Sequence, residues 1–180
     1  MSDQSTKFDR VVVPHLSDAL TLARWLVGNR AAAEDIVQDA CLRAFRGIND
    51  FADGNAKSWV LTIVRNTAYS WLVKNRTAML VSVEDLNIKE RAYVERGGGL
   101  ASPSAATPES ELIMRSETAR IEAAIEALPA EFRETLVLHD IQGLKYREIA
   151  EVTGTPVGTV MSRLARARRR LMDAVKVDEA

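Results

Sequence analysis

Residues 144–171 read LKYREIAEVTGTPVGTVMSRLARARRRL, and this stretch decides the fold. The pattern predicts a short helix over residues 146–152, a tight turn, and a longer second helix. Gly154 suits a turn that needs a positive φ, Thr155 can cap the second helix, and Pro156 fits its first position. This order and spacing are typical of a helix-turn-helix.

The second helix of this motif is predicted to have two different faces. Its inward stripe, at helical spacing, consists of Val160, Leu164, Ala167 and Leu171. An ordinary helical hairpin with a solvated arginine face is the alternative, but five arginines without an acid over residues 161–171 favour DNA binding. Arginines and hydroxyls on the outward face can reach base edges or phosphates in the major groove. The predicted DNA-binding residues are Thr155, Thr159, Ser162, Arg163, Arg166 and Arg169; Arg168, Arg169 and Arg170 suit phosphates or solvent better than bases.

The rest of the chain is also predicted to be helical, so the fold class is all-α. Three helices are expected in the N-terminal part, over residues 17–27, 31–46 and 56–74. Ser17 is predicted to cap the first of them and Gly28 to end it. A further helix is expected from about residue 111 to Leu128, and another begins at Pro129.

A segment rich in glycine and proline separates the two helical parts. Residues 97–108 read GGGLASPSAATP, which is typical of a flexible linker. A long surface loop within one domain is the alternative, although such loops are uncommon in compact domains. We therefore predict two small helical domains, residues 1–76 and 111–180, joined by a linker over residues 77–110.

Composition limits the classes of function. The 180-residue chain is 47% hydrophobic with a formal net charge of −1, which argues against a protein that coats nucleic acids generically. Cys41 is the single cysteine, so no internal disulfide can form, and a reducing, intracellular setting is expected. The N-terminal stretch MSDQSTKFDR does not resemble a signal peptide, and no apolar run is long enough for membrane insertion.

Three segments resemble the extracytoplasmic-function (ECF) sigma factors of the sigma-70 family, which are dissociable subunits of bacterial RNA polymerase. AAAEDIVQDACLRAFRGI (31–48) and KSWVLTIVRNTAYSWLVKN (57–75) are similar to region 2 of that family. Residues 128–171, from LPAEFRETL to the helix-turn-helix, are similar to region 4. The regions follow one another in the family's order, around a short variable segment.

The resemblance implies roles for residues in region 2. The helix over residues 31–46 would dock on the β′ subunit of core RNA polymerase, and the matching residues are Asp35, Gln38, Asp39 and Arg43. Without the resemblance, these side chains would be a solvated helix face. The loop before the helix at 56–74 would bind a base flipped out of the promoter −10 element. The residues that match the family's −10 positions are Asp53, Asn55, Lys57, Trp59, Arg65, Asn66, Lys74 and Arg76. For Trp59, the alternative is a place in the hydrophobic core.

The sequence therefore predicts a cytoplasmic bacterial sigma factor with the β′ and β subunits and promoter DNA as partners. The resemblance also implies control by an anti-sigma factor and a part in stress responses. A helix-turn-helix regulator that acts without polymerase is the second hypothesis, but the N-terminal part has no signature of a ligand pocket or phosphoacceptor. An enzyme is the third hypothesis. His15 and His139 are isolated, and no cluster has metal-ligand spacing, so no catalytic residue, metal or cofactor is expected.

Overall fold

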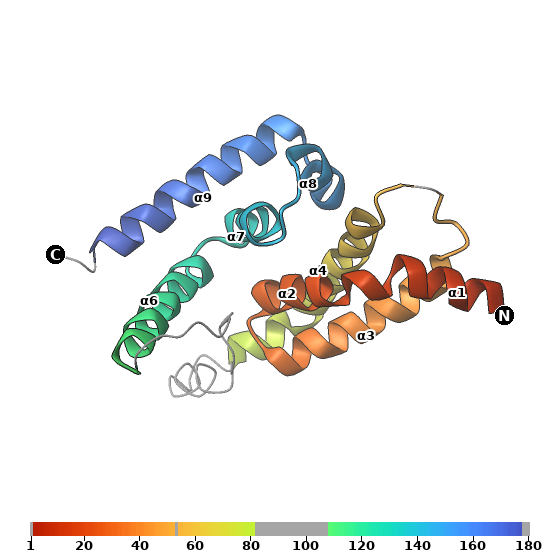
Figure 1. Cartoon of the computed structure of the whole chain (residues 1–180), viewed down its shortest axis with the longest axis horizontal. Coiled ribbons are helices and arrows are strands. Elements are labelled where there is room, and N and C mark those ends of the chain that lie inside the picture. Colours follow the sequence, from red (N-terminus) through yellow and green to blue (C-terminus); the bar gives the residue numbers. More distant parts are fainter. Residues whose placement is uncertain (1, 53, 82–107, 178–180) are drawn as a thin grey trace.

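The computed structural model describes residues 2–52, 54–81 and 108–177, and the regular elements in that part of the chain are all helical, which confirms the predicted fold class. Figure 1 shows a group of N-terminal helices beside a group of C-terminal helices. The first group, here called the N-terminal bundle, contains α1 (Ser2–Val11), the 3₁₀ turn η1 (Val13–His15), α2 (Leu16–Val27), α3 (Arg30–Gly47) and α4 (Ala56–Val81). The second group, here called the C-terminal unit, contains α6 (Pro108–Glu126), α7 (Ala130–Leu136), the π-helical turn η3 (Val137–Ile141), α8 (Tyr146–Thr153) and α9 (Val157–Val177).

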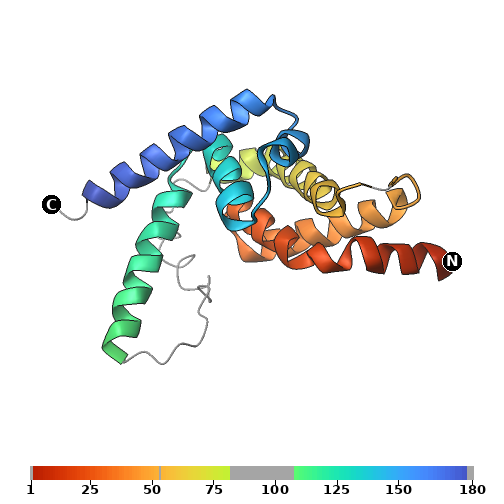
Figure 2. The same ribbon diagram turned by 45° about the horizontal axis from the view of Figure 1, so that its top comes forward.

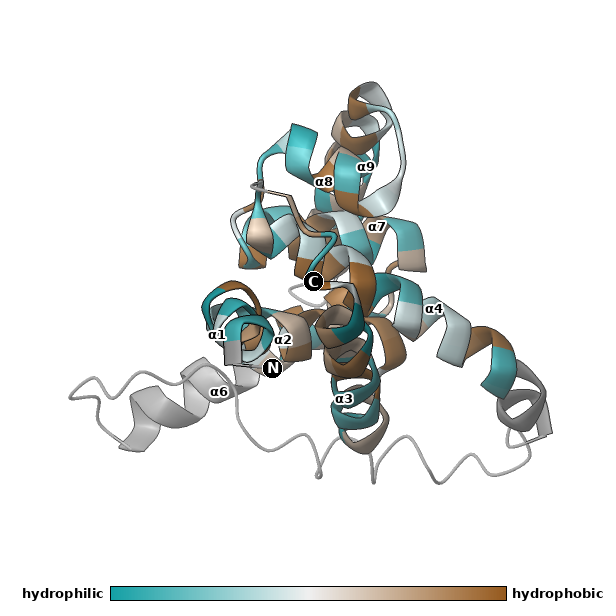
Figure 3. Cartoon of the chain, turned by 90° about the vertical axis from the view of Figure 1, so that its right-hand side faces the viewer, coloured by the Kyte–Doolittle hydropathy of each residue, from teal (hydrophilic) through white to brown (hydrophobic). Residues whose placement is uncertain are grey.

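The N-terminal bundle buries the apolar stripes of α2, α3 and α4 against one another, and its hydrophobic segments gather between the packed helices (Figure 3). Leu22 of α2, Ile36 of α3 and Leu61 of α4 have at most 1% of their surface exposed. Phe45 lies at the edge of this core, where its ring meets Phe8 of α1 edge-on with the centroids 5.5 Å apart. The helix α1 therefore shields part of the Phe45 ring, of which 39% stays exposed.

Two predicted helix boundaries in the bundle were wrong. Ser17 does not cap α2, because the chain passes directly from η1 into a helix that begins at Leu16. The carbonyl of Ser17 instead accepts a hydrogen bond from the Thr21 hydroxyl at 2.9 Å. The helix predicted over residues 56–74 continues to residue 81, since no glycine or proline interrupts the segment NRTAMLV at residues 75–81.

The end of α2 agrees with the prediction, since Gly28 ends the helix with a φ of 69°. The sequence analysis did not predict the cap of α3, where the Asn29 side chain accepts a hydrogen bond from the Ala32 amide at 2.9 Å. Helix reaches into both ends of the predicted linker, over residues 77–81 and 108–110. Residues 82–107, which hold most of the predicted linker, lie outside the described residues.

The helix-turn-helix consists of α8 and α9, as predicted, with Gly154 between them at a φ of 65°. The preceding helix α7 begins after Pro129 and passes at Val137 into η3, which the sequence did not predict. The amide of Gln142 donates to the Val137 carbonyl at 3.0 Å, five residues back, and this wider turn ends the helix before α8.

The N-terminal bundle and the C-terminal unit pack against each other. Contacts between α2 and α7 and between α4 and α8 join them, and buried apolar residues of both belong to one continuous core. Figure 2 shows α8 beside the start of α4, while α6 and α9 extend away from the bundle. The helix-turn-helix is therefore held next to the loop that precedes α4.

Candidate DNA interface and polymerase-facing surface

The recognition helix α9 has the two faces that its sequence predicts. Val160, Leu164 and Ala167 are at most 2% exposed, and Leu171 is partly buried against the same core. On the other face, Ser162, Arg166 and Arg169 are exposed, while Thr155, Thr159 and Arg163 are partly exposed. The hydroxyls of Thr155 and Thr153 lie 2.8 Å apart, and the helix begins with the Pro156 carbonyl, which accepts from the Val160 amide. Thr155 thus braces the turn, and no cap from it to α9 is observed in the structure.

The arginines of α9 fall into two groups. Arg168 donates to both carboxylate oxygens of Asp140, at 3.1 and 2.5 Å, and the guanidinium of Arg170 lies 5.1 Å from the centre of the Phe132 ring. Hydrogen bonding from Arg168 lowers the pKa of Asp140 below its ordinary value. These two arginines tie α9 to the elements before the motif. In the part of the chain that the structure describes, Arg163, Arg166 and Arg169 form no ion pair, so they are available to a ligand.

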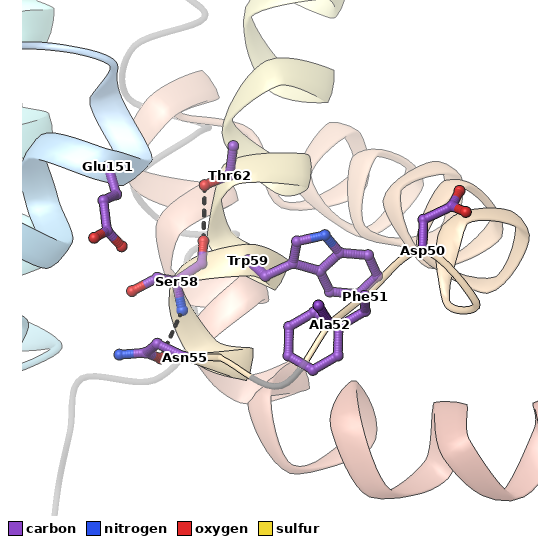
Figure 4. Close-up of a pocket in the computed structure, with 8 residues that line it drawn as sticks. All are labelled: Asp50, Phe51, Ala52, Asn55, Ser58, Trp59, Thr62 and Glu151. Carbon is purple, nitrogen blue, oxygen red and sulfur yellow. Dashed lines mark hydrogen bonds between the residues drawn. The ribbon is translucent and has the colours of Figure 1, made fainter.

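A pocket of about 310 Å³ lies where the loop before α4 meets α8. Phe51 and Trp59 form an aromatic wall (Figure 4). Their ring centroids are 5.0 Å apart. Asn55 lies at the rim, where its Oδ1 accepts the Ser58 amide at 3.0 Å and so caps α4. The full lining is Asp50, Phe51, Ala52, Asn55, Ser58, Trp59, Thr62 and Glu151. A flat ring could stack on the aromatic wall and hydrogen-bond at the rim.

Trp59 therefore lines a pocket and is not a fully buried core residue. The sequence did not single out Phe51, Ser58 or Thr62, which line the same pocket. Among the described residues, the buried Ser58 hydroxyl has no hydrogen-bond partner. The helical spacing from Ser58 to Thr62 was the available signal, because it places both hydroxyls on one side of α4.

The other described residues predicted for the −10 element are either paired within the chain or exposed. Lys57 forms an ion pair with Asp18 at 3.0 Å, and Arg65 is paired with Glu134. Asn66 and Lys74 are exposed on α4. Asp53 and the side chain of Arg76 lie outside the described residues.

The predicted polymerase-binding residues share one exposed face of α3. Asp35, Gln38, Asp39 and Arg43 all point away from the bundle core, and Arg43 pairs with Asp39 at 2.9 Å. Leu42, on the same helix, is 59% exposed. A polar surface with an exposed apolar side chain suits a protein partner.

Within the described residues, no three His, Cys, Asp or Glu side chains are placed to hold a metal ion. None of the described helices is long and apolar enough to cross a membrane. Cys41 is half-buried in α3, and this burial raises the pKa of its thiol, which makes it a poor nucleophile at neutral pH.

The recognition helix, with free arginines on its outward face, places the protein among the helix-turn-helix DNA-binding factors of transcription. Residues 11–77 match Sigma-70 region 2, and residues 118–171 match Sigma-70, region 4. The chain belongs to the ECF group of the sigma-70 family, whose members direct RNA polymerase in transcription initiation. Members of this family are transcription factors and in general not catalysts.

Relatives with known names match most of this chain. It is 32% identical to the ECF RNA polymerase sigma factor SigE of Mycolicibacterium smegmatis, over 92% of this chain and 60% of that protein. It is 34% identical to the ECF RNA polymerase sigma-E factor of Escherichia coli, over 79% of this chain and 73% of the relative. The chain thus spans less than two thirds of the mycobacterial protein.

Two solved structures have a similar fold. The sigma factor RpoE of Bartonella quintana, in complex with the anti-sigma factor NepR, has a TM-score of 0.66 and 28% identity, covering 95% of this chain and 98% of that chain. CnrH, in complex with the cytosolic domain of CnrY, has a TM-score of 0.61 and 25% identity, covering 95% of this chain and 88% of that chain.

Proposed function

We propose that the chain reads promoters through two separate surfaces, the outward face of α9 for the −35 element and the pocket before α4 for the −10 element. The proposal rests on which arginines of α9 form contacts with the rest of the chain and which do not. Arg163 and Arg166 are not used by the fold, although Arg168 and Arg170 in the same helix are. Side chains that the fold leaves unused on a recognition helix can form bidentate contacts with guanine.

The pocket supports the second half of the proposal. A base flipped from the non-template strand would stack on Phe51 and Trp59 and meet the side-chain amide of Asn55. Lys57, Arg65, Asn66 and Lys74 lie along α4, where they could follow the strand backbone. Strand opening would be driven by this binding, so we infer that the chain needs no catalytic residue and no cofactor.

The −35 assignment predicts different effects for two exposed arginines of α9. Arg166→Ala should weaken binding to a −35 duplex by about 1–3 kcal/mol and relax the preference at one base pair. Arg169→Ala is the matched control, since it removes the same charge from a position suited to phosphate and should weaken binding about equally on all sequences. Fluorescence anisotropy on a panel of single-base −35 variants measures both. If the two variants show the same base preferences as the wild type, Arg166 does not read sequence.

We propose that α3 is the polymerase-binding surface, through Asp35, Gln38, Asp39 and Arg43. All four residues are exposed and lie away from the bundle core. The polar face is thus free to meet a partner while the opposite face of α3 holds the bundle together.

Reversal of one charge tests this surface. Asp39→Arg should leave the fold intact, because the Asp39–Arg43 pair is about half exposed and pairs of that kind contribute at most about 1 kcal/mol. Its recovery of β′ and β in a pull-down should fall at least about tenfold, since like charges opposite a buried interface are strongly unfavourable. Glu117→Arg, at an exposed position of α6, makes the same charge change elsewhere and should not alter recovery. Normal recovery with Asp39→Arg would show that this face is only solvated.

We further infer that an anti-sigma factor controls the chain, because the solved relative RpoE of Bartonella quintana is in complex with the anti-sigma factor NepR. We also infer that the chain acts in the bacterial cytoplasm, because its family works with RNA polymerase. We retain residues 1–76 and 111–180 as the proposed functional domains, each with its own DNA surface, and residues 77–110 as the linker.

A further inference from the structure

The pocket before α4 has an aromatic wall whose two rings are held in different ways (Figure 4). Trp59 belongs to α4, where its amide donates to the Asn55 carbonyl at 3.0 Å in the first turn of the helix. Phe51 belongs to the loop between α3 and α4, and its amide reaches the Ile48 carbonyl only at 3.3 Å. Because a ligand that stacks on this wall meets both rings, its binding depends on what holds the loop in place.

The first helix of the chain holds this loop from outside the pocket. The ammonium group of Lys7 in α1 donates to the Phe51 carbonyl at 2.9 Å. The contact is partly buried, and it joins residues 44 positions apart in the sequence. A hydrogen bond from a charged donor is stronger than one between neutral groups. The backbone of Phe51 is therefore fixed by α1 as well as by its own loop.

The helix α1 is itself anchored at points that do not involve the loop. It lies alongside the end of α3 that leads into the loop (Figures 1 and 2). The side-chain amide of Gln4 donates to the Phe45 carbonyl at 2.9 Å, and the Phe8 ring meets the Phe45 ring edge-on. At the end of α1, Val12 is 1% exposed and belongs to the hydrophobic core. Lys7 therefore extends from a helix with its own support.

We propose that Lys7 is a positioning residue for base selection at the −10 element: through the Phe51 carbonyl, it holds the aromatic wall in the arrangement that a flipped base needs. The inference rests on the proposed −10 role of the pocket. Lys7 does not belong to the pocket lining, so it acts through Phe51 and not on the base. A wall held in one arrangement favours the base that fits it, whereas a wall that moves accepts other bases more readily.

Loss of the Lys7 contact should act on the middle of the loop and not on its ends. Ile48 is 0% exposed at the start of the loop, and Asn55 caps α4 at the other end. Asp50 and Ala52, on either side of Phe51, are exposed, so side-chain packing holds them little. Without Lys7, fewer molecules have a formed wall, and the apparent affinity for a flipped base falls with that fraction.

Lys7→Met tests the proposal, because it keeps the apolar stem of the side chain and removes the donor. The full chain is assembled with core polymerase, and the probes are fluorescent single strands with the non-template −10 region of a promoter that this complex transcribes. A panel of probes carries each alternative base at each −10 position. Lys7→Met should bind the parent probe about fivefold more weakly and discriminate less between bases at the flipped position. Lys7→Arg keeps a cationic donor and should restore both properties.

Two control variants separate this role from a change of charge and from a loosened helix. Arg10→Met removes a positive charge from an exposed position of α1 and should behave like the wild type. Gln4→Leu removes a hydrogen bond of α1 that does not reach the loop, so base discrimination should stay at the wild-type level. An equal loss in Gln4→Leu and Lys7→Met would show that any loosening of α1 weakens the site, which overturns the specific role of Lys7.

A further measurement and a further variant make the result unambiguous. Affinity for a −35 duplex serves as the internal reference, and Lys7→Met should leave it unchanged, because α1 has no part in the outward face of α9. Trp59→Ala, measured on the same probes, tests the pocket itself. If Trp59→Ala weakens −10 binding but Lys7→Met changes neither affinity nor discrimination, the positioning role is overturned and the proposed function stands. If Trp59→Ala has no effect, the proposed −10 role of the pocket fails, and the inference fails with it.

Discussion

Leu22→Ala should lower the free energy of unfolding by about 2–5 kcal/mol, which is the usual range for removing a fully buried leucine. Leu22 lies in the middle of α2 with 0% of its surface exposed, and α2 packs against both α3 and α4. The substitution removes apolar contacts and leaves a cavity that the surrounding helices can fill only in part. Urea titration followed by far-ultraviolet circular dichroism measures the loss.

Leu42→Ala provides the matched control, since it removes the same atoms from a side chain that is 59% exposed. It should change the free energy of unfolding by no more than about 0.5 kcal/mol. Equal losses for Leu22→Ala and Leu42→Ala would mean that the packing of α2 described here does not stabilise the bundle.

The helix-turn-helix was predicted almost completely because its determinants are local. Gly154 takes the positive φ expected of it, and the inward stripe of α9 is buried as its spacing requires. Thr155 was predicted to cap α9, but its hydroxyl lies against the hydroxyl of Thr153 instead. A hydroxyl beside a turn has several possible partners. Helical periodicity fixes which face is buried, whereas the choice of hydrogen-bond partner depends on atoms that periodicity does not describe.

In the N-terminal bundle, tertiary contacts decide whether the first helix forms. No helix was predicted over residues 2–11, because this polar segment gives little apolar signal by itself. It folds as α1 where Phe8 meets Phe45 and where Lys7 donates to the Phe51 carbonyl at 2.9 Å. Both contacts join residues more than 35 positions apart, so no local pattern could have indicated them.

The candidate site was predicted in part. Asn55 and Trp59 do line a pocket, and their resemblance to family positions was sufficient to find them. The pairing of Arg65 with Glu134 could not be found in this way, since the partners are 69 residues apart and sequence alone does not place α7 against α4. The charge of Arg65, which was assigned to a DNA backbone, is neutralised in this structure by Glu134 of the same chain.

Leu164→Ala should have a comparably large effect on the C-terminal unit, and it links stability to DNA binding. Leu164 is 2% exposed in the inward stripe of α9, which packs against both α7 and α8. Its truncation should cost about 2–5 kcal/mol and lower the unfolding temperature of this unit. Binding to a −35 duplex should fall in parallel, because outward arginines can meet base edges only if their helix is held in place.

Met172→Ala is the control for this change, because Met172 lies on the same helix and is 56% exposed. It should leave both the unfolding temperature and the affinity for −35 DNA close to the wild-type values. Leu164→Ala should weaken binding to every −35 variant by the same factor, because it changes the fraction of folded recognition helix and not its contacts. If Leu164→Ala instead altered base preference at unchanged stability, Leu164 would face the DNA, and the inward and outward faces of α9 would have to be exchanged.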